Sequence, residues 1–226
     1  MNRDGRLRFA LLAVLVLGTA EAWQGTHPVT GRQIAPVMGM GGADWLVRPE
    51  REREERPAEA LKLIGLRKGM TVADIGAGVG YFSIRMAKQV GPEGKVYATD
   101  IQASMLERLR DSAIRNKVNN IETVLGSATE TGLPLNSIDL ALLVDVYHEF
   151  SEPQKMLQAI AAALKNDGRL VLLEYRKEDP SVPIREEHKM SIEQVRQELA
   201  AEGFVMEKVL HDLPRQHILV FRKRPS

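Results

Sequence analysis

Short apolar runs alternate with amphipathic segments along most of the chain. Each apolar run is bounded by turn residues such as Gly, Pro, Asn and Asp, which is typical of a buried strand. We expect strands at 70–75, 95–100, 121–125, 138–144 and 169–175. The intervening segments repeat apolar side chains with the helical period, and we expect helices at 81–90, 104–116, 153–164 and 191–201. This alternation specifies an α/β fold with a mostly parallel sheet and helices on both faces.

The C-terminal part of the chain departs from this alternation. Two further apolar runs, 204–210 and 217–222, are joined by a tight turn at 212–214 with no helix between them. A parallel pair needs a longer crossover, so these two strands are expected to pair antiparallel. We therefore predict a doubly wound sheet of seven strands, six of them parallel and the last reversed.

The first residues have the layout of a secretory signal peptide. Arg3, Arg6 and Arg8 precede an uncharged apolar run at 9–20, and Ala20-Glu21-Ala22 is a small-x-small cleavage pattern. The apolar run is about 12 residues, short of the roughly 20 that a membrane-spanning helix needs. We expect residues 1–22 to be removed on export to the periplasm or the medium. An uncleaved membrane anchor and a helix buried in the fold are the alternatives.

Two segments precede the first strand. Residues 23–48 are rich in Gly, Met and Pro, which predicts an irregular segment that serves as a lid or as a linker. Residues 49–56 are a dense run of Glu and Arg, which is typical of a solvated helix face with i,i+4 ion pairs. The predicted organisation is a signal peptide at 1–22, an irregular segment at 23–48 and one domain at 49–226.

The amino-acid composition excludes several kinds of site and partner. The chain of 226 residues is 44% hydrophobic and 27% charged, as a globular protein is, and it has no cysteine. Disulfides, thiolate zinc sites and cysteine nucleophiles are therefore excluded. The net charge is +1 and aromatic residues make up only 5%, so neither a charged surface nor base stacking points to a nucleic-acid partner. Contact with a membrane is expected only through the export signal.

A glycine-rich stretch, 74–80, joins the first strand to the first helix, and Asp100 ends the second strand 20 residues after Gly80. Glycines at such a turn let the backbone approach a ligand, and a carboxylate at this place can accept hydrogen bonds from a ribose. The dinucleotide fingerprint is G-x-G-x-x-G, whereas this chain has G-x-G-x-G, with its third glycine one place early.

The stretch with Asp74 in front resembles the first motif of class I S-adenosylmethionine-dependent methyltransferases, (V/L)-x-D-x-G-x-G-x-G. The segments 133–139 and 165–170 resemble later motifs of that family, whose Rossmann-like sheet also has a reversed seventh strand. The chain looks most like the small-molecule branch that contains quinone and arsenic methyltransferases, and its lack of cysteine disfavours arsenic. The resemblance implies S-adenosylmethionine as cofactor, contacted by Asp74, Gly76, Ala77, Gly78, Gly80, Tyr81, Asp100, Ile101, Ser127, Ala128 and Asp145. The family's acidic contact to adenine is missing, and Ser127 or Thr129 takes its place.

Acceptor chemistry is expected at the carboxyl ends of the fourth and fifth strands and at the final turn. In one hypothesis His148 is a general base that Glu174 or Glu149 orients, because imidazole titrates near neutrality. The residues expected to contact the acceptor are Tyr147, Arg176, His188 and His217. In a second hypothesis His148, His188 and His217 bind a metal with a carboxylate. In a third, these polar side chains belong only to loops and the surface.

These observations predict methyl transfer from S-adenosylmethionine to a small molecule without a metal. A nicotinamide-dependent oxidoreductase with a Rossmann domain and a non-catalytic binding module are the alternative functions. The acceptor and the oligomeric state do not follow from the sequence.

Overall fold

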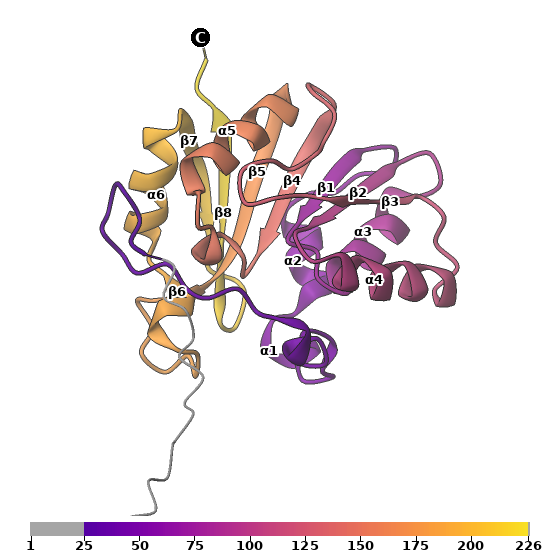
Figure 1. The fold of residues 1–226 in the computed structure, drawn as a ribbon, viewed down its shortest axis with the longest axis horizontal. Helices are drawn as coiled ribbons and strands as arrows, with labels where there is room; N and C mark the ends of the chain where they lie inside the picture. The colour runs from indigo at the N-terminus through magenta and orange to yellow at the C-terminus, as the bar shows by residue number, and fades with distance from the viewer. Residues whose placement is uncertain (1–24, 226) are drawn as a thin grey trace, which may run out of the picture.

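The computed structural model describes residues 25–225 (Figure 1). The predicted signal peptide at 1–22 therefore lies outside the described residues. Among the described residues, no helix has both the length and the apolar character needed to cross a membrane.

A single sheet organises the fold. Its strand order is β3-β2-β1-β4-β5-β8-β7, and β8 runs antiparallel to both of its neighbours while the other pairs on this path are parallel. This confirms the prediction of six strands in one direction and a reversed last strand. The strands are β1 (Thr71–Ile75), β2 (Lys95–Asp100), β3 (Ile121–Leu125), β4 (Ile138–Val144), β5 (Leu164–Arg176), β7 (Phe204–Leu210) and β8 (Gln216–Lys223).

Two details of the strands differ from the prediction. A short strand, β6 (Lys189–Met190), pairs in parallel with the end of β5, and two residues are too few to leave a pattern in the sequence. Strand β5 begins at Leu164 and not at 169, because Leu164 pairs with Ile138 before the register shifts.

Helices cover both faces of the sheet, as predicted (Figure 1). Apolar side chains of α5 (Pro153–Ala163) and α6 (Ile192–Ala201) pack on one face, and those of α2 (Pro57–Leu63) and α3 (Tyr81–Val90) pack on the other. Helix α4 (Ala103–Arg115) buries Leu106 and Leu109 beside β2. A capping box starts α6, where Ser191 Oγ accepts from the Gln194 backbone N–H.

The charged run at 49–56 is not the solvated helix that the sequence predicted. It forms one turn, α1 (Arg51–Glu54), and then breaks at Arg56, whose φ of 48° is left-handed, before Pro57 begins α2. Arg51 and Glu55 are buried, with 5% and 1% of their surfaces exposed. Arg51 and Glu55 of the run are therefore part of the interior, where they pair with each other, while Glu50, Glu52, Arg53 and Arg56 are exposed.

Residues 25–48 cross the carboxyl edge of the sheet (Figure 1). They contain two 3-10 turns, η1 (Met40–Gly42) and η2 (Trp45–Val47). Ala35 N–H donates to the His148 carbonyl, and Arg32 Nε donates to Glu198 of α6 at 2.9 Å. The segment is thus irregular, as predicted, but it is packed against the domain and does not behave as a linker.

Candidate functional site

A cavity of about 780 Å³ lies between residues 36–55 and the carboxyl edge of the sheet. This is the edge at which open parallel sheets bind ligands, and the volume is within the ~300–1,000 Å³ typical of small-molecule sites. The predicted residues that line it are Asp74, Gly76, Ala77, Gly78, Tyr81, Asp100, Ile101, Ser127, Ala128, Asp145, His148 and His188.

The glycine loop lies against the cavity with left-handed backbone at Gly76 (φ 71°) and Gly78 (φ 52°). A Cβ at Gly76 would lie 2.5 Å from Val146 Cγ2, and one at Gly78 would lie 2.8 Å from Leu46 Cδ1. The left-handed backbone therefore favours glycine at both positions, and lack of space adds to this at Gly76, where the branched side chain of Val146 is close.

Gly80, which is predicted to contact the cofactor, is not among the residues that line the cavity. It precedes α3 with a φ of 88°, and a Cβ there would lie 2.6 Å from Leu109 Cγ. Its role is close packing of the loop against α4.

Asp100 and Asp74 present two carboxyl groups to the loop. Asp100 Oδ2 accepts from Gly78 N–H at 2.8 Å and Oδ1 accepts from Gln102 N–H at 2.9 Å, which fixes the group at the cavity wall. Since a carboxylate offers about four acceptor sites, Asp100 keeps capacity for ligand hydroxyls. Asp74 Oδ2 accepts from Ser83 Oγ at 2.5 Å, and burial raises the pKa of Asp74 to about 6.

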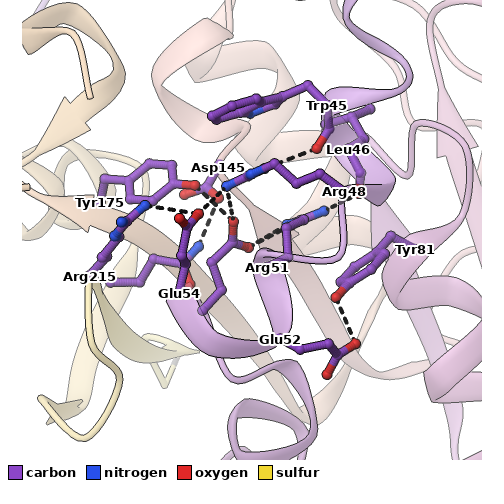
Figure 2. Close-up of polar contacts among 12 residues, drawn as sticks. Trp45, Leu46, Arg48, Arg51, Glu52, Glu54, Tyr81, Asp145, Tyr175 and Arg215 are labelled. Atoms are coloured by element: carbon purple, nitrogen blue, oxygen red, sulfur yellow. Dashed lines mark hydrogen bonds and ion pairs between the residues drawn. The ribbon is translucent and has the colours of Figure 1, made fainter. Parts of the chain in front are cut away.

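A cluster of alternating arginines and glutamates closes one side of the cavity (Figure 2). Within this arginine–glutamate cluster (Arg48, Arg51, Glu54, Glu55), Arg51 Nη2 lies 2.6 Å from Glu55 Oε2 and Arg48 Nη2 lies 2.9 Å from Glu54 Oε2. Tyr175 Oη donates to Glu55 Oε1 at 2.9 Å. The cluster ties α1 to the end of β5, and the sequence did not predict it because dense mixed charge is usually solvated.

Asp145 lies next to this cluster at the end of β4 (Figure 2). Its φ is 52°, its Oδ2 accepts from Gln216 Nε2 at 2.7 Å, and its buried Oδ1 has no hydrogen-bond partner among residues 25–225. Burial, together with nearby Glu55 and Glu174, raises the pKa of Asp145 well above its usual range. A buried acceptor of this kind is suited to a ligand donor.

The predicted pair of His148 and Glu174 is present. His148 Nδ1 lies 2.6 Å from Glu174 Oε2, while Glu174 Oε1 accepts from the Tyr147 backbone N–H at 2.9 Å. Burial opposes a charge on the imidazole, but the adjacent Glu174 carboxylate outweighs burial and raises the pKa of His148. Glu174 is fully buried and does not line the cavity, so it positions His148 and touches no ligand.

The other ring nitrogen of His148 is also engaged. His188 Nδ1 lies 3.1 Å from His148 Nε2, and Glu149 Oε1 lies 4.0 Å from each of these two nitrogens. Burial, with His148 and Arg185 nearby, lowers the pKa of His188 to about 4. Burial raises the pKa of Glu149 to about 7. The sequence predicts Glu149 only as an alternative to Glu174 for the partner of His148.

Three predicted acceptor contacts lie outside the cavity. Tyr147 is buried in the core, with its hydroxyl 3.3 Å from His27 Nε2. Arg176 donates to the backbone carbonyls of Leu213 and Gln216, which fixes the β7–β8 hairpin. His217 is fully buried, and within the described part of the chain neither of its ring nitrogens has a hydrogen-bond partner. Among the described residues, the ligand atoms close enough together to hold one metal ion belong to His148, Glu149 and His188, so the predicted metal site that includes His217 is not found there.

Comparison with known proteins shows whether the glycine loop is of the methyltransferase kind or of the dinucleotide-binding kind. Residues 66–214 match the model of a family described as methyltransferase domain, which is more than half of the chain. The chain belongs to this family. The glycine loop of this methyltransferase domain is thereby assigned to the S-adenosylmethionine class and not to the dinucleotide class.

Relatives of the methyltransferase domain include enzymes of quinone biosynthesis. It is 30% identical over 125 residues to a demethylmenaquinone methyltransferase of Listeria monocytogenes, covering 55% of this chain and 52% of the relative. It is 33% identical over 117 residues to the ubiquinone/menaquinone biosynthesis C-methyltransferase UbiE of Escherichia fergusonii, covering 50% and 45%. The chain thus spans about half the length of the curated relatives it matches.

Solved structures of similar fold support the same family. A SAM-dependent methyltransferase from Aquifex aeolicus aligns with a TM-score of 0.78 and 27% identity, over 82% of this chain and 98% of that one. The [4+2]-cyclase SpnF shares the fold at 17% identity, with a TM-score of 0.63 over 76% of this chain and 81% of that one. The protein is therefore a domain of the S-adenosylmethionine-dependent methyltransferase class.

Proposed function

We propose that the protein transfers the methyl group of S-adenosylmethionine to a small aromatic acceptor of the quinol type. The observation that carries this proposal is one cavity with two unlike ends. One end has the glycine loop and Asp100, and the other has His148, Glu149 and His188.

The residues at the first end fit the cofactor. Asp100 offers acceptors for the ribose hydroxyls, and the glycine loop leaves room for close approach of the ligand backbone. The unpartnered Asp145 Oδ1 fits the ammonium of the methionine end, because a buried acceptor needs a donor. The bound cofactor would supply an electrophilic methyl group on its sulfonium.

The residues at the second end fit an apolar ring that carries an ionisable oxygen. Phe150, Met156 and Ile184 give this part of the cavity an apolar wall. Alignment of acceptor and methyl group supplies much of the rate of such a displacement. The names of the relatives in quinone biosynthesis support the choice of acceptor class.

Calorimetry with S-adenosylhomocysteine tests the cofactor half of the proposal. The intact chain is expected to bind it, and Asp100→Ala is expected to weaken binding at least tenfold, about 1.4 kcal/mol, because the ribose contacts are lost. Ile114→Ala, a change at an exposed apolar residue of α4, serves as control. Absence of binding by the intact chain overturns the proposal, and it leaves the fold with a non-methylating role.

Labelled cofactor tests the acceptor half. Incubation with a panel of hydroquinones, catechols and naphthols is expected to label at least one of them. Binding of S-adenosylhomocysteine without transfer to any member of the panel contradicts the acceptor class but leaves the cofactor assignment intact.

We further propose that residues 1–22 direct export and are removed. The basic, apolar and small-residue order of this segment supports the proposal. Mass spectrometry of the protein from its native host is expected to find an N-terminus at position 23. A chain that starts at Met1 or Asn2 contradicts cleavage.

A further inference from the structure

We infer that His148, Glu149 and His188 bind a divalent transition-metal cation at the acceptor end of the cavity. The inference deepens the proposed function, because such an ion would contact the acceptor. The binding of the ion itself requires neither cofactor nor acceptor, so it is measured separately.

The spacing of the three ligand atoms carries the inference. His148 Nε2, His188 Nδ1 and Glu149 Oε1 form a triangle with sides of 3.1, 4.0 and 4.0 Å. A point in the plane of that triangle lies about 2.2 Å from all three atoms, close to the ~2.0–2.2 Å that Zn²⁺ makes with imidazole nitrogen and carboxylate oxygen. One ion therefore fits among the three side chains with little rearrangement.

The surroundings hold these ligands in place. Glu174 occupies His148 Nδ1, so that Nε2 is the nitrogen presented to the cavity. Histidine ligands of metals usually donate their other N–H to a carboxylate in this way. His148 and Glu149 lie in the turn η3 (Tyr147–Glu149), and His188 ends the turn η4 (Glu186–His188), which β6 follows directly. The ligand side chains are 2%, 12% and 15% exposed.

The donor set indicates the kind of ion and its use. Two imidazoles and one carboxylate suit Zn²⁺, Fe²⁺ or Mn²⁺ and leave coordination positions open. The cavity reaches all three ligands, so a hydroxyl of the acceptor can take an open position. A bound cation lowers the pKa of such a hydroxyl, which then releases its proton to solvent. His148 itself cannot take that proton, because both of its ring nitrogens already contact other side chains. Release to solvent, promoted by the cation, replaces a general base.

A hydrogen bond between the two imidazole rings is the competing explanation of the 3.1 Å contact. It requires a proton on one of the facing nitrogens, and Arg185 Nη2, 3.2 Å from His188 Nε2, favours that arrangement. With an ion bound, His188 Nε2 carries the proton and the half-exposed Arg185 turns toward Glu187, whose Oε1 already lies 3.4 Å from Arg185 Nε.

Titration of chelator-treated protein with Co²⁺, and then with Zn²⁺ and Mn²⁺, distinguishes the two. We expect visible d–d absorption of Co²⁺ and one calorimetric site per chain. His188→Ala and His188→Gln are expected to weaken binding at least 100-fold, and Glu174→Gln 10- to 100-fold as a positioning residue. His211→Ala, at an exposed histidine of the β7–β8 turn, is the matched control and keeps the wild-type affinity.

Circular dichroism shows whether each variant is folded. Wild-type protein that binds these ions no more tightly than the folded His188 variants overturns the inference and leaves a ring-to-ring hydrogen bond. Ion binding without S-adenosylhomocysteine binding overturns only the proposed function, and the reverse result overturns only the metal site.

Discussion

Asp74 is a buried carboxyl whose pKa is raised to about 6, so the folded protein holds its proton more tightly than the unfolded chain does. Its contribution to stability is present below the ordinary pKa of about 4 and is lost as the pH rises through 6. Asp74→Asn is therefore expected to be more stable than the wild type at pH 7.5, by about 1–3 kcal/mol. Urea unfolding at several pH values measures this difference, which should vanish near pH 4. A variant that is less stable at pH 7.5 shows that the ionised carboxylate is stabilised.

Gly76 combines a left-handed backbone with a crowded Cβ position. Gly76→Ala should cost about 1–3 kcal/mol of stability and weaken S-adenosylhomocysteine binding at least tenfold, because the loop must move away from Val146. Gly91→Ala is the matched control, since Gly91 has a φ of 73° with no atom within 4 Å of its Cβ position and lies outside the cavity. It should lose stability but keep the affinity. Equal affinity of both variants would mean that the loop does not contact the cofactor.

At the scale of elements, α1 is held by buried charges more than by apolar packing. Arg51→Met leaves Glu55 less compensated in the interior, which is expected to cost about 3 kcal/mol. Arg51→Met with Glu55→Met removes both charges, and we expect it to be at least 2 kcal/mol more stable than the sum of the single variants predicts. Denaturant unfolding of the four proteins gives this coupling energy. Additive effects would show that the pair is not coupled.

Some helices and strands follow from the pattern of the sequence, while other features depend on contacts that the pattern does not show. Strands β1 to β4 follow from short apolar runs bounded by turn residues and helix α3 from its helical periodicity, and the structure confirms them. The break at Arg56 and the pairing of β6 depend on contacts between distant segments. No local pattern encodes those contacts.

The residues of the candidate site also fall into some that the sequence predicts and some that it does not. Its cofactor end depends on a local motif, and most of the residues predicted from that motif line the cavity. The acceptor end is built largely from the turns that follow the strands, η3 and η4, and no periodic pattern in the sequence shows which way their side chains point. His148 and His188 reach the cavity, while Tyr147 and His217 lie in the core. The sequence does not predict the arginine–glutamate cluster, because dense runs of Arg and Glu are usually exposed to solvent.

At the scale of the whole molecule, the first described segment is fastened to the last helix. Arg32 and Glu198, whose side chains pair, are 166 positions apart in the chain. A chain made from its N-terminus therefore cannot form this ion pair until α6 has been made. Closing so long a loop comes late in folding, since its entropy cost precedes any gain from the contact. A nascent or truncated chain without α6 therefore lacks the ion pair that fastens Arg32 beside the cavity, although Ala35 and Met38 can still bond to His148 and Gln102.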